Sequence, residues 1–447
     1  MKKLYLYIFM IMIAHYICAQ DSVWTLDRCI AYGKEHNLSV RQSEWDARLA
    51  QMIYESSRYS HLPNLNLSSN YGMNFGRSIN PTTNQFENTR FSSIGLSASA
   101  HTLLFGWFQK RYAINNNELQ YQKTAENMEQ RKGELVLTIA TAYLRALLAQ
   151  EQISNLLFQI ELSNNNRTRI EKLLDAGRSN ILELSQSRHQ LAADSSLYYQ
   201  ALLNYEQALI DLKVVLNLDL NAPLVPEMNI SESDIVFMEK PDPEVIYREA
   251  VGIFPVINQM ELELDISERN IRIAKAKSLP QLSMYFSTGT NYSSSFYEYL
   301  PSGERELMNF GRQLNTNFSQ SIGIGLSIPV FNGFASRDAI RSAEINLKKT
   351  AVAAEMEKQQ LQQTVYKACI DYEVTLKQYT SSLSAGRHSE TAFYAAHTRY
   401  ENGLIPYFEY LAEKNNFLQA QNELTAVKYN LRFKKLVVEY YGGKDIK

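Results

Sequence analysis

The sequence predicts an α+β membrane fold, in which long α-helices in coiled-coil packing adjoin β-strands that contribute to a β-barrel shared between chains. Three observations predict it. Short stretches alternate apolar and small polar residues, long stretches without proline carry apolar residues spaced by seven, and the whole pattern occurs twice along 447 residues. The chain is therefore expected to be an internal tandem repeat.

The N-terminal segment has the pattern of a secretory signal peptide. Two lysines precede an apolar run over residues 4–17, and Cys-Ala-Gln follows. We expect cleavage after Ala19; the alternative is a lipoprotein in which Cys18 is acylated. Residues 1–19 are therefore assigned to a signal peptide, and the mature chain is predicted to be exported.

Composition and charge argue against several classes of function. The net charge is −2 and the mean hydropathy is −0.31. Such a chain has no basic excess for binding nucleic acid. After the signal, no apolar run reaches the roughly 18 residues that a spanning helix needs. We therefore predict no nucleic-acid partner and no helical membrane anchor.

The stretch LNLSSNYGMNFG, residues 65–76, alternates as a β-strand with one apolar face and one small polar face. Three further stretches, 93–100, 281–292 and 321–328, alternate similarly. The apolar face belongs either in the core of a soluble sandwich or against lipid. Its residues in the first stretch are Leu65, Leu67, Tyr71, Met73 and Phe75.

Four strands cannot close a barrel, because the smallest membrane barrels have eight. Open sheet edges are not tolerated in lipid. If these are membrane strands, several chains must share one barrel; three chains give twelve strands and four give sixteen. The loops at 77–90 and 293–315 are polar and are expected to face outside the cell.

Two long regions, 82–222 and 330–405, contain no proline. Helices exclude interior proline because it lacks the N–H and clashes with the preceding turn. Apolar residues repeat every seven positions, which predicts helices that supercoil on one another. The two clearest stripes are Leu184, Leu191, Tyr198, Tyr205 and Leu212, and Tyr410, Phe417, Leu424, Leu431 and Val438.

These two stripes superpose at an offset of 226 residues, which also places Gly177 on Gly403. We predict a first repeat over 20–217, a linker over 218–243 and a second repeat over 244–447. Each repeat is expected to contain a helix of about 37 residues, a β-hairpin, a helix of about 65 residues, a glycine turn and a helix of about 37 residues.

The repeated order, with its motifs, resembles the TolC-like outer membrane efflux protein family. The motifs are HLPNL and SLPQL where helix meets strand, LSIPVFNGF (326–334) where strand meets helix, and RYENGLIPYFEYLAEKNNFLQAQNEL (399–424) around the second glycine turn. The resemblance covers essentially the whole mature chain.

The resemblance implies a homotrimer in the outer membrane of a Gram-negative bacterium. It implies a twelve-stranded barrel in outer membrane lipid and a helical tunnel through the periplasm. The partners would be a periplasmic adaptor (membrane fusion protein) and an inner-membrane pump of the resistance-nodulation-division or ABC type. The exported substrates would be small molecules or proteins.

The resemblance also indicates gate residues near the glycine turns at the periplasmic tip. Glu183 and Glu409 each lie six residues after a turn glycine, Gly177 or Gly403, where the family commonly carries Asp. Tyr400 falls on the family's gate tyrosine. We therefore expect Glu183, Glu409 and Tyr400 to line the constriction.

Two observations limit this expectation. Ile405 and Ala412 stand where the family has a gate arginine and a second acid, which favours an apolar or hydrogen-bonded closure over one locked by charges. Acids in a first helical turn are also stabilised by capping and by the helix dipole without any gating role.

No motif of an enzyme, cofactor site or metal site occurs in the sequence. Cys29 and Cys369 lie in apolar stripes and are expected to be buried thiols. The leading hypothesis is thus a non-enzymatic export channel. The alternative is an exported adhesive or structural surface protein, a coiled-coil bundle with a β-anchor and no transport.

Overall fold

The computed structural model describes residues 23–79, 84–228, 240–301 and 303–444. The predicted signal peptide, 1–19, lies outside the described residues. The chain forms two compact units. The helical unit contains the described residues of 1–46, 125–259 and 354–447, and the sheet unit contains those of 47–124 and 260–353. Each unit thus takes residues from both predicted repeats.

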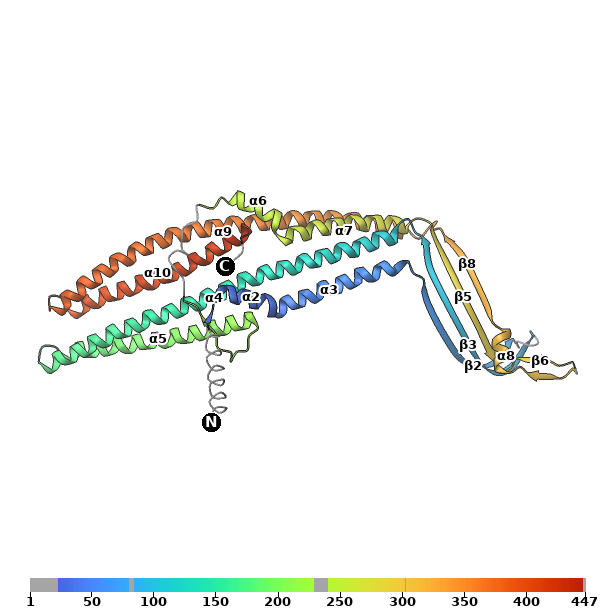
Figure 1. The fold of residues 1–447 in the computed structure, drawn as a ribbon, viewed down its shortest axis with the longest axis horizontal. Coiled ribbons are helices and arrows are strands. Elements are labelled where there is room, and N and C mark those ends of the chain that lie inside the picture. Colours follow the sequence, from blue (N-terminus) through green and yellow to red (C-terminus); the bar gives the residue numbers. More distant parts are fainter. Residues whose placement is uncertain (1–22, 80–83, 229–239, 302, 445–447) are drawn as a thin grey trace, which may run out of the picture. The chain divides into compact units, whose positions relative to one another are not determined.

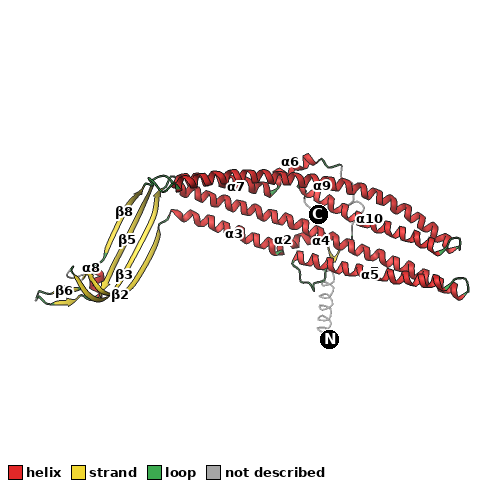
Figure 2. Cartoon of the chain, turned by 180° about the vertical axis from the view of Figure 1, so that it is seen from behind, coloured by secondary structure: helices red, strands yellow, loops and turns green. Residues whose placement is uncertain are grey.

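The helices follow the predicted order twice (Figures 1 and 2). The two longest, α4 and α9, have 67 residues each, close to the expected length. The first repeat contains α2 (Leu26–His36), α3 (Leu38–Arg58), α4 (Gln109–Asp175) and α5 (Ile181–Leu216), with a 3-10 turn at Tyr59–His61. The second contains α6 (Pro243–Ile253), α7 (Pro255–Lys277), α9 (Ala335–Glu401) and α10 (Tyr407–Tyr441).

The first helix of each repeat is broken, so the prediction of one continuous helix of about 37 residues is wrong. Asn37 separates α2 from α3, and its side chain accepts hydrogen bonds from the N–H groups of Ser39 and Val40. Phe254 separates α6 from α7 in an extended conformation. It precedes Pro255, whose ring disfavours a helical residue before it.

The sheet unit contains a four-stranded antiparallel sheet in the order β2-β3-β5-β8. Its strands are β2 (Asn64–Ile79), β3 (Phe86–Phe105), β5 (Gln281–Ser293) and β8 (Ser319–Ser327). The helical unit has one small parallel pair, β1 (Val23–Trp24) with β4 (Val225–Pro226).

Both predicted loops contain regular structure. In the first, pairing continues to Ile79 and Phe86, so β2 and β3 extend well into 77–90. In the second, β6 (Tyr297–Tyr299) pairs with β7 (Arg305–Leu307), and α8 (Phe310–Thr316) follows. The expectation of plain loops at 77–90 and 293–315 is therefore wrong in part.

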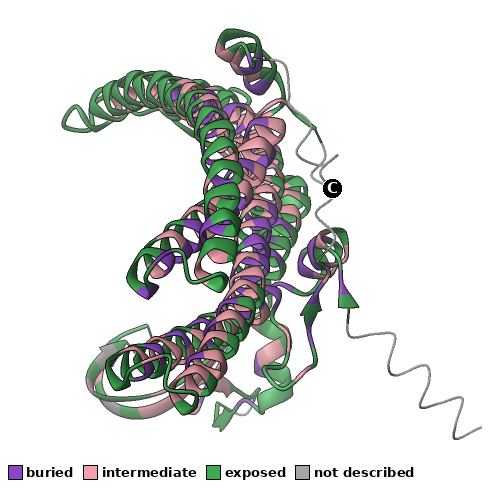
Figure 3. Cartoon of the chain, turned by 90° about the vertical axis from the view of Figure 1, so that its left-hand side faces the viewer, coloured by how far each residue is buried: buried purple, intermediate pink, exposed green. Residues whose placement is uncertain are grey.

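Buried residues run along the helices of the helical unit (Figure 3). One cluster contains mostly first-repeat residues, and Cys29 lies in it. A second contains mostly second-repeat residues, with Cys369. Both thiols are free and buried, as predicted, and burial raises the pKa of each. A third cluster combines residues of α4, α5, α9 and α10 near the glycine turns.

Candidate functional site

One face of the four-stranded sheet is apolar. Residues directly paired across antiparallel strands share a face, and Leu65 pairs with Ala100, which pairs with Phe286. Phe286 in turn pairs with Ile322. In the single chain this face is uncovered: Leu67 is 83% exposed. The alternation predicted over 65–76 thus extends into an apolar surface across four strands.

The opposite face is polar and built mostly from small side chains, with Phe91 and Tyr285 as large exceptions. Rows of hydroxyl and amide groups cross the sheet, and the Oγ atoms of Ser68 and Ser97, and of Ser287 and Ser321, are each 2.7 Å apart. From Asn64 to Asn74 and across their described partners, this face carries no Asp, Glu, Lys or Arg. Such a face is suited to line water.

The sheet is not closed. Among the described strands, β2 pairs only with β3, and β8 pairs only with β5. Both outer strands therefore present free backbone donors and acceptors. A membrane cannot satisfy such edges, so the sheet needs further strands from outside the chain.

The two glycine turns have the same backbone conformation and the same pattern of hydrogen bonds. Gly177 and Gly403 have φ values of +69° and +72°, a conformation that glycine adopts without a Cβ clash. In each turn the glycine N–H and the next N–H bond back to the helix, to Leu174 and Leu173 after α4 and to Tyr400 and Arg399 after α9. The turns thus lie where the repeat pattern predicts them.

The two candidate acids lie in different surroundings. Glu183 is half-buried; its N–H is capped by the Asn180 side chain at 2.9 Å, and its Oε2 accepts from the Ser179 hydroxyl at 2.6 Å. Glu409 is exposed and donates its N–H to the Pro406 carbonyl at 3.2 Å. Helix capping therefore accounts for the position of Glu183 in the first turn of α5 without a role in gating.

Tyr400 belongs to an aromatic stack at the tip of the second repeat, which a cation from the first repeat contacts. Its ring lies parallel to that of Tyr410 with centroids 4.8 Å apart. The guanidinium of Arg169, from α4, lies 4.7 Å above the Tyr400 ring and donates to the carbonyls of Tyr400 and Glu401 at 3.1 and 2.7 Å. Burial raises the pKa of the Tyr400 hydroxyl, Arg169 lowers it, and Glu183 raises it.

The structure thus brings Glu183 and Tyr400 into electrostatic range and adds Arg169, which the sequence pattern did not indicate. Ile405, at the family's arginine position, is buried in the third hydrophobic cluster and supplies no charge. The guanidinium at this tip instead belongs to Arg169, from the other repeat. Sequence alone gave no sign of this, because Arg169 lies 231 residues from Tyr400.

A second feature missed in the sequence is a buried polar cluster that links α4, α5 and α10. It contains Gln159, Ser163, Gln190, Asp194 and Lys414. Asp194 is 0% exposed and Lys414 is 2% exposed, with Nζ and Oδ2 3.4 Å apart. Ser163 donates to Asp194 and accepts from Lys414, whose pKa is lowered by burial.

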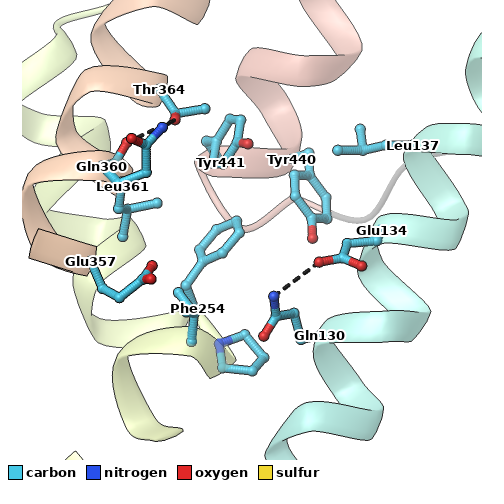
Figure 4. Close-up of a pocket in the computed structure, with 12 residues that line it drawn as sticks. Gln130, Glu134, Leu137, Phe254, Glu357, Gln360, Leu361, Thr364, Tyr440 and Tyr441 are labelled. Atoms are coloured by element: carbon cyan, nitrogen blue, oxygen red, sulfur yellow. Dashed lines mark hydrogen bonds between the residues drawn. The ribbon is translucent and has the colours of Figure 1, made fainter. Parts of the chain in front are cut away.

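The helical unit also holds a cavity of about 190 Å³, shown in Figure 4. Phe254 stacks on Tyr441 and meets Tyr440 edge-on, both at 5.2 Å between centroids. Gln130 donates to Glu134 on one side. None of the predicted gate residues lines this cavity, which lies at the break between α6 and α7.

Two negative findings apply to the described ranges. None of the described helices combines the length and the apolar character needed to cross a bilayer. Nor do three or more His, Cys, Asp or Glu side chains gather into a possible metal site anywhere in the described part of the chain.

An uncovered apolar sheet face, a polar opposite face and open edges, together with paired long helices, define a channel-forming outer membrane protein. Comparison with known proteins agrees. The model of the family "Outer membrane efflux protein" matches residues 33–218 and 247–434. The chain belongs to this family, as the resemblance predicted, and the family is one of channels rather than enzymes.

Individual relatives are distant but similar over most of their length. The outer membrane protein TolC of Escherichia coli is 21% identical over 90% of this chain and 79% of its own. The probable outer membrane lipoprotein SilC of Salmonella typhimurium is 22% identical over 92% and 85%. The crystal structure of the outer membrane protein VceC of Vibrio cholerae matches with a TM-score of 0.76, 14% identity and coverage of 94% and 97%. The protein is thus an outer membrane channel of an efflux or secretion system.

Proposed function

We propose that three copies of the chain form the channel, so that β2 of one copy pairs with β8 of the next in a twelve-stranded barrel. The open edges of the four-stranded sheet support this proposal. Twelve strands exceed the minimum of eight and leave room for an aqueous lumen. The apolar face would contact outer membrane lipid, and the serine- and asparagine-rich face would line the lumen.

Mass and conductance of the purified protein test this proposal together. In detergent, its mass should be three times that of one mature chain. In planar bilayers the same sample should give single-channel steps. A monomer without conductance contradicts the proposal and favours the adhesive alternative, whereas a trimer with conductance excludes a structure without transport.

We further propose that the tips of α4–α5 and α9–α10 form the periplasmic gate. Arg169 bonds the tip of the first repeat to the Tyr400 turn of the second, and Glu183 lies within electrostatic range of that tyrosine. Parting the two helix pairs must break these contacts. Glu183 and Glu409, present three times each in a trimer, would give the narrow end a negative potential.

Replacing both acids, Glu183→Gln with Glu409→Gln, should weaken the cation selectivity of the channel, because closely spaced carboxylates attract cations. The measurement is the reversal potential under a salt gradient. Arg169→Gln is the matched variant: it should raise the conductance of the resting channel without weakening cation selectivity. An unchanged reversal potential in the double variant would show that the acids act only as helix caps.

The partners we propose are a periplasmic adaptor and an inner-membrane pump of the resistance-nodulation-division or ABC type. Beside each acid, the return helix exposes a large apolar side chain, Leu182 at 63% and Phe408 at 72%. Exposed apolar groups at equivalent places of the two repeats favour a docking surface. Cysteines at these two positions should crosslink to the adaptor in cells; no crosslink at either contradicts this surface.

A further inference from the structure

We propose that Arg77 and Arg90 form a binding site for the phosphate group of an outer-leaflet lipid. The proposal rests on the proposed function, because it needs the apolar sheet face to contact the outer membrane. It concerns a part of the sheet that neither the gate nor the lumen uses, the hairpin end of β2 and β3.

The strand register places both arginines on the apolar face. Arg90 pairs directly with Phe75, and Arg77 follows Phe75 by two residues and pairs with Asn88. The ring of Phe86 supports this assignment, because the Arg77 guanidinium lies 5.2 Å from its centroid. Diagonal neighbours of this kind have Cα atoms about 7–8 Å apart. Arg90 is the other diagonal neighbour of Arg77, on the far side of Asn88 from Phe86. The Arg77 guanidinium must therefore leave the Phe86 ring for both guanidinium groups to reach one phosphate.

Arg77 and Arg90 lie along β2 and β3 at the depth where lipid headgroups are expected. From Leu65 to Phe75 the apolar face spans 11 residues. At about 3.3 Å per residue and a tilt of about 40°, this is a band of roughly 25 Å, the height typical of outer membrane barrels. Since β2 begins next to α3 and runs away from it, the hairpin end lies on the extracellular side. Arg77 and Arg90 thus lie at the outer end of the band from Leu65 to Phe75, with the Ile79–Phe86 pair beyond them on the same face.

The charge on this face has a single sign. The paired positions beyond Phe75 on the same face are Arg77, Ile79, Phe86, Asn88 and Arg90. Glu87 pairs with Ser78 and so lies on the opposite face. Guanidinium groups bind phosphate with paired N–H donors and are weakly hydrated, which suits a headgroup boundary. A lipid phosphate is the anion that a membrane presents at this depth.

The test measures binding of lipid A carrying both phosphates to the full-length trimer, by native mass spectrometry from detergent. The wild type should bind it in preference to the same lipid after enzymatic dephosphorylation. Arg77→Gln with Arg90→Gln should weaken binding of the phosphorylated form by about tenfold or more, since charge-assisted hydrogen bonds are lost. Arg305→Gln, in the β6–β7 hairpin outside the four-stranded sheet, should bind as the wild type does.

Equal binding of both lipid forms by the wild type overturns the proposal, and this result needs no variant to fold. Unchanged binding by the double variant also overturns it, as does complete displacement of the lipid by inorganic phosphate at an equal concentration. Mass and conductance are recorded on the same samples. A monomer without conductance contradicts the proposed function instead, whereas a conducting trimer without phosphate preference contradicts only the lipid site.

Discussion

Asp194→Ala is expected to lower the free energy of unfolding by about 3–5 kcal/mol, because it leaves the Lys414 ammonium buried without its counter-charge. Asp194 also accepts hydrogen bonds from Gln159 and Gln190, at 2.6 and 2.8 Å, and these amides would lose their acceptor. Thermal unfolding followed by circular dichroism measures the loss.

The loss should depend on pH in a defined direction. Burial lowers the pKa of Lys414, so between its folded pKa and its ordinary value the unfolded chain binds more protons. Stability from this group therefore rises with pH over that range. The deficit of Asp194→Ala should shrink toward alkaline pH, as the Lys414 amine becomes neutral and no longer needs an anion.

Two comparisons separate the effect of breaking the buried Asp194–Lys414 pair from a general sensitivity of the protein to the loss of an ion pair. Arg188, at the position of the first repeat equivalent to Lys414, pairs with Glu171 on the surface at 2.9 Å. Glu171→Gln should leave the melting temperature nearly unchanged, since exposed ion pairs contribute little. Asp194→Leu with Lys414→Met should recover the part of the loss that comes from the unpaired ammonium, because apolar residues can replace a buried ion pair. The part that comes from the Gln159 and Gln190 amides should remain. Equal losses in Asp194→Ala and Glu171→Gln would contradict the role of burial.

Leu96→Arg is expected to destabilise the membrane-inserted barrel by about 2–4 kcal/mol per chain, the penalty for arginine near the bilayer midplane. Leu96 pairs with Ser69 on β2 and with Thr290 on β5, midway along the apolar face. Urea unfolding of the reconstituted protein, and the fraction of trimer recovered from outer membranes, measure the effect.

The adjacent residue supplies the control. Ser97 faces the opposite side and shares a hydroxyl hydrogen bond with Ser68. Ser97→Arg should retain the trimer and shift the channel toward anions, because it adds positive charge to the proposed lumen. A reversed pattern, with Ser97→Arg lost from the membrane and Leu96→Arg retained, would show that the two faces are assigned the wrong way round.

Patterns of neighbouring residues in the sequence predicted most of the fold. Alternation over 65–76 and the proline-free heptad regions predicted strands and helices, because both depend on neighbouring residues along the chain. The 226-residue offset placed Gly177 and Gly403 in equivalent turns. The break before Pro255 was missed although the local rule for residues before proline applies there. The break at Asn37 was also missed, although Asn is a favoured N-cap residue and its side chain accepts from the N–H groups of Ser39 and Val40. Only its second bond, to the Val215 carbonyl 178 residues away, depends on the tertiary structure.

Only part of the candidate gate could be predicted from the sequence. The resemblance to the family, matched at the turn glycines, indicated Glu183, Glu409 and Tyr400, and their role in gating stays a prediction. Arg169 was not named, because its contact with the Tyr400 turn joins residues of different repeats. A heptad pattern places apolar residues in the core, so it gives no reason to expect Lys414 and Asp194 to be buried, as they are.

The sequence by itself determined the long helices, the four alternating strands and the tandem repeat, since each is encoded in local spacing, and its repeated motifs indicated the family. It did not determine the helix breaks at Asn37 and Phe254 or the elements β6, β7 and α8. Only the tertiary structure decided which side chains meet across the repeats: Arg169 with Tyr400, and Lys414 with Asp194. It also decided the register that sets Arg90 opposite Phe75. The physical reason is that such contacts depend on how distant segments pack. Whether a charged side chain is buried, and so whether its ionised form is destabilised, cannot be predicted from the spacing of residues along the chain.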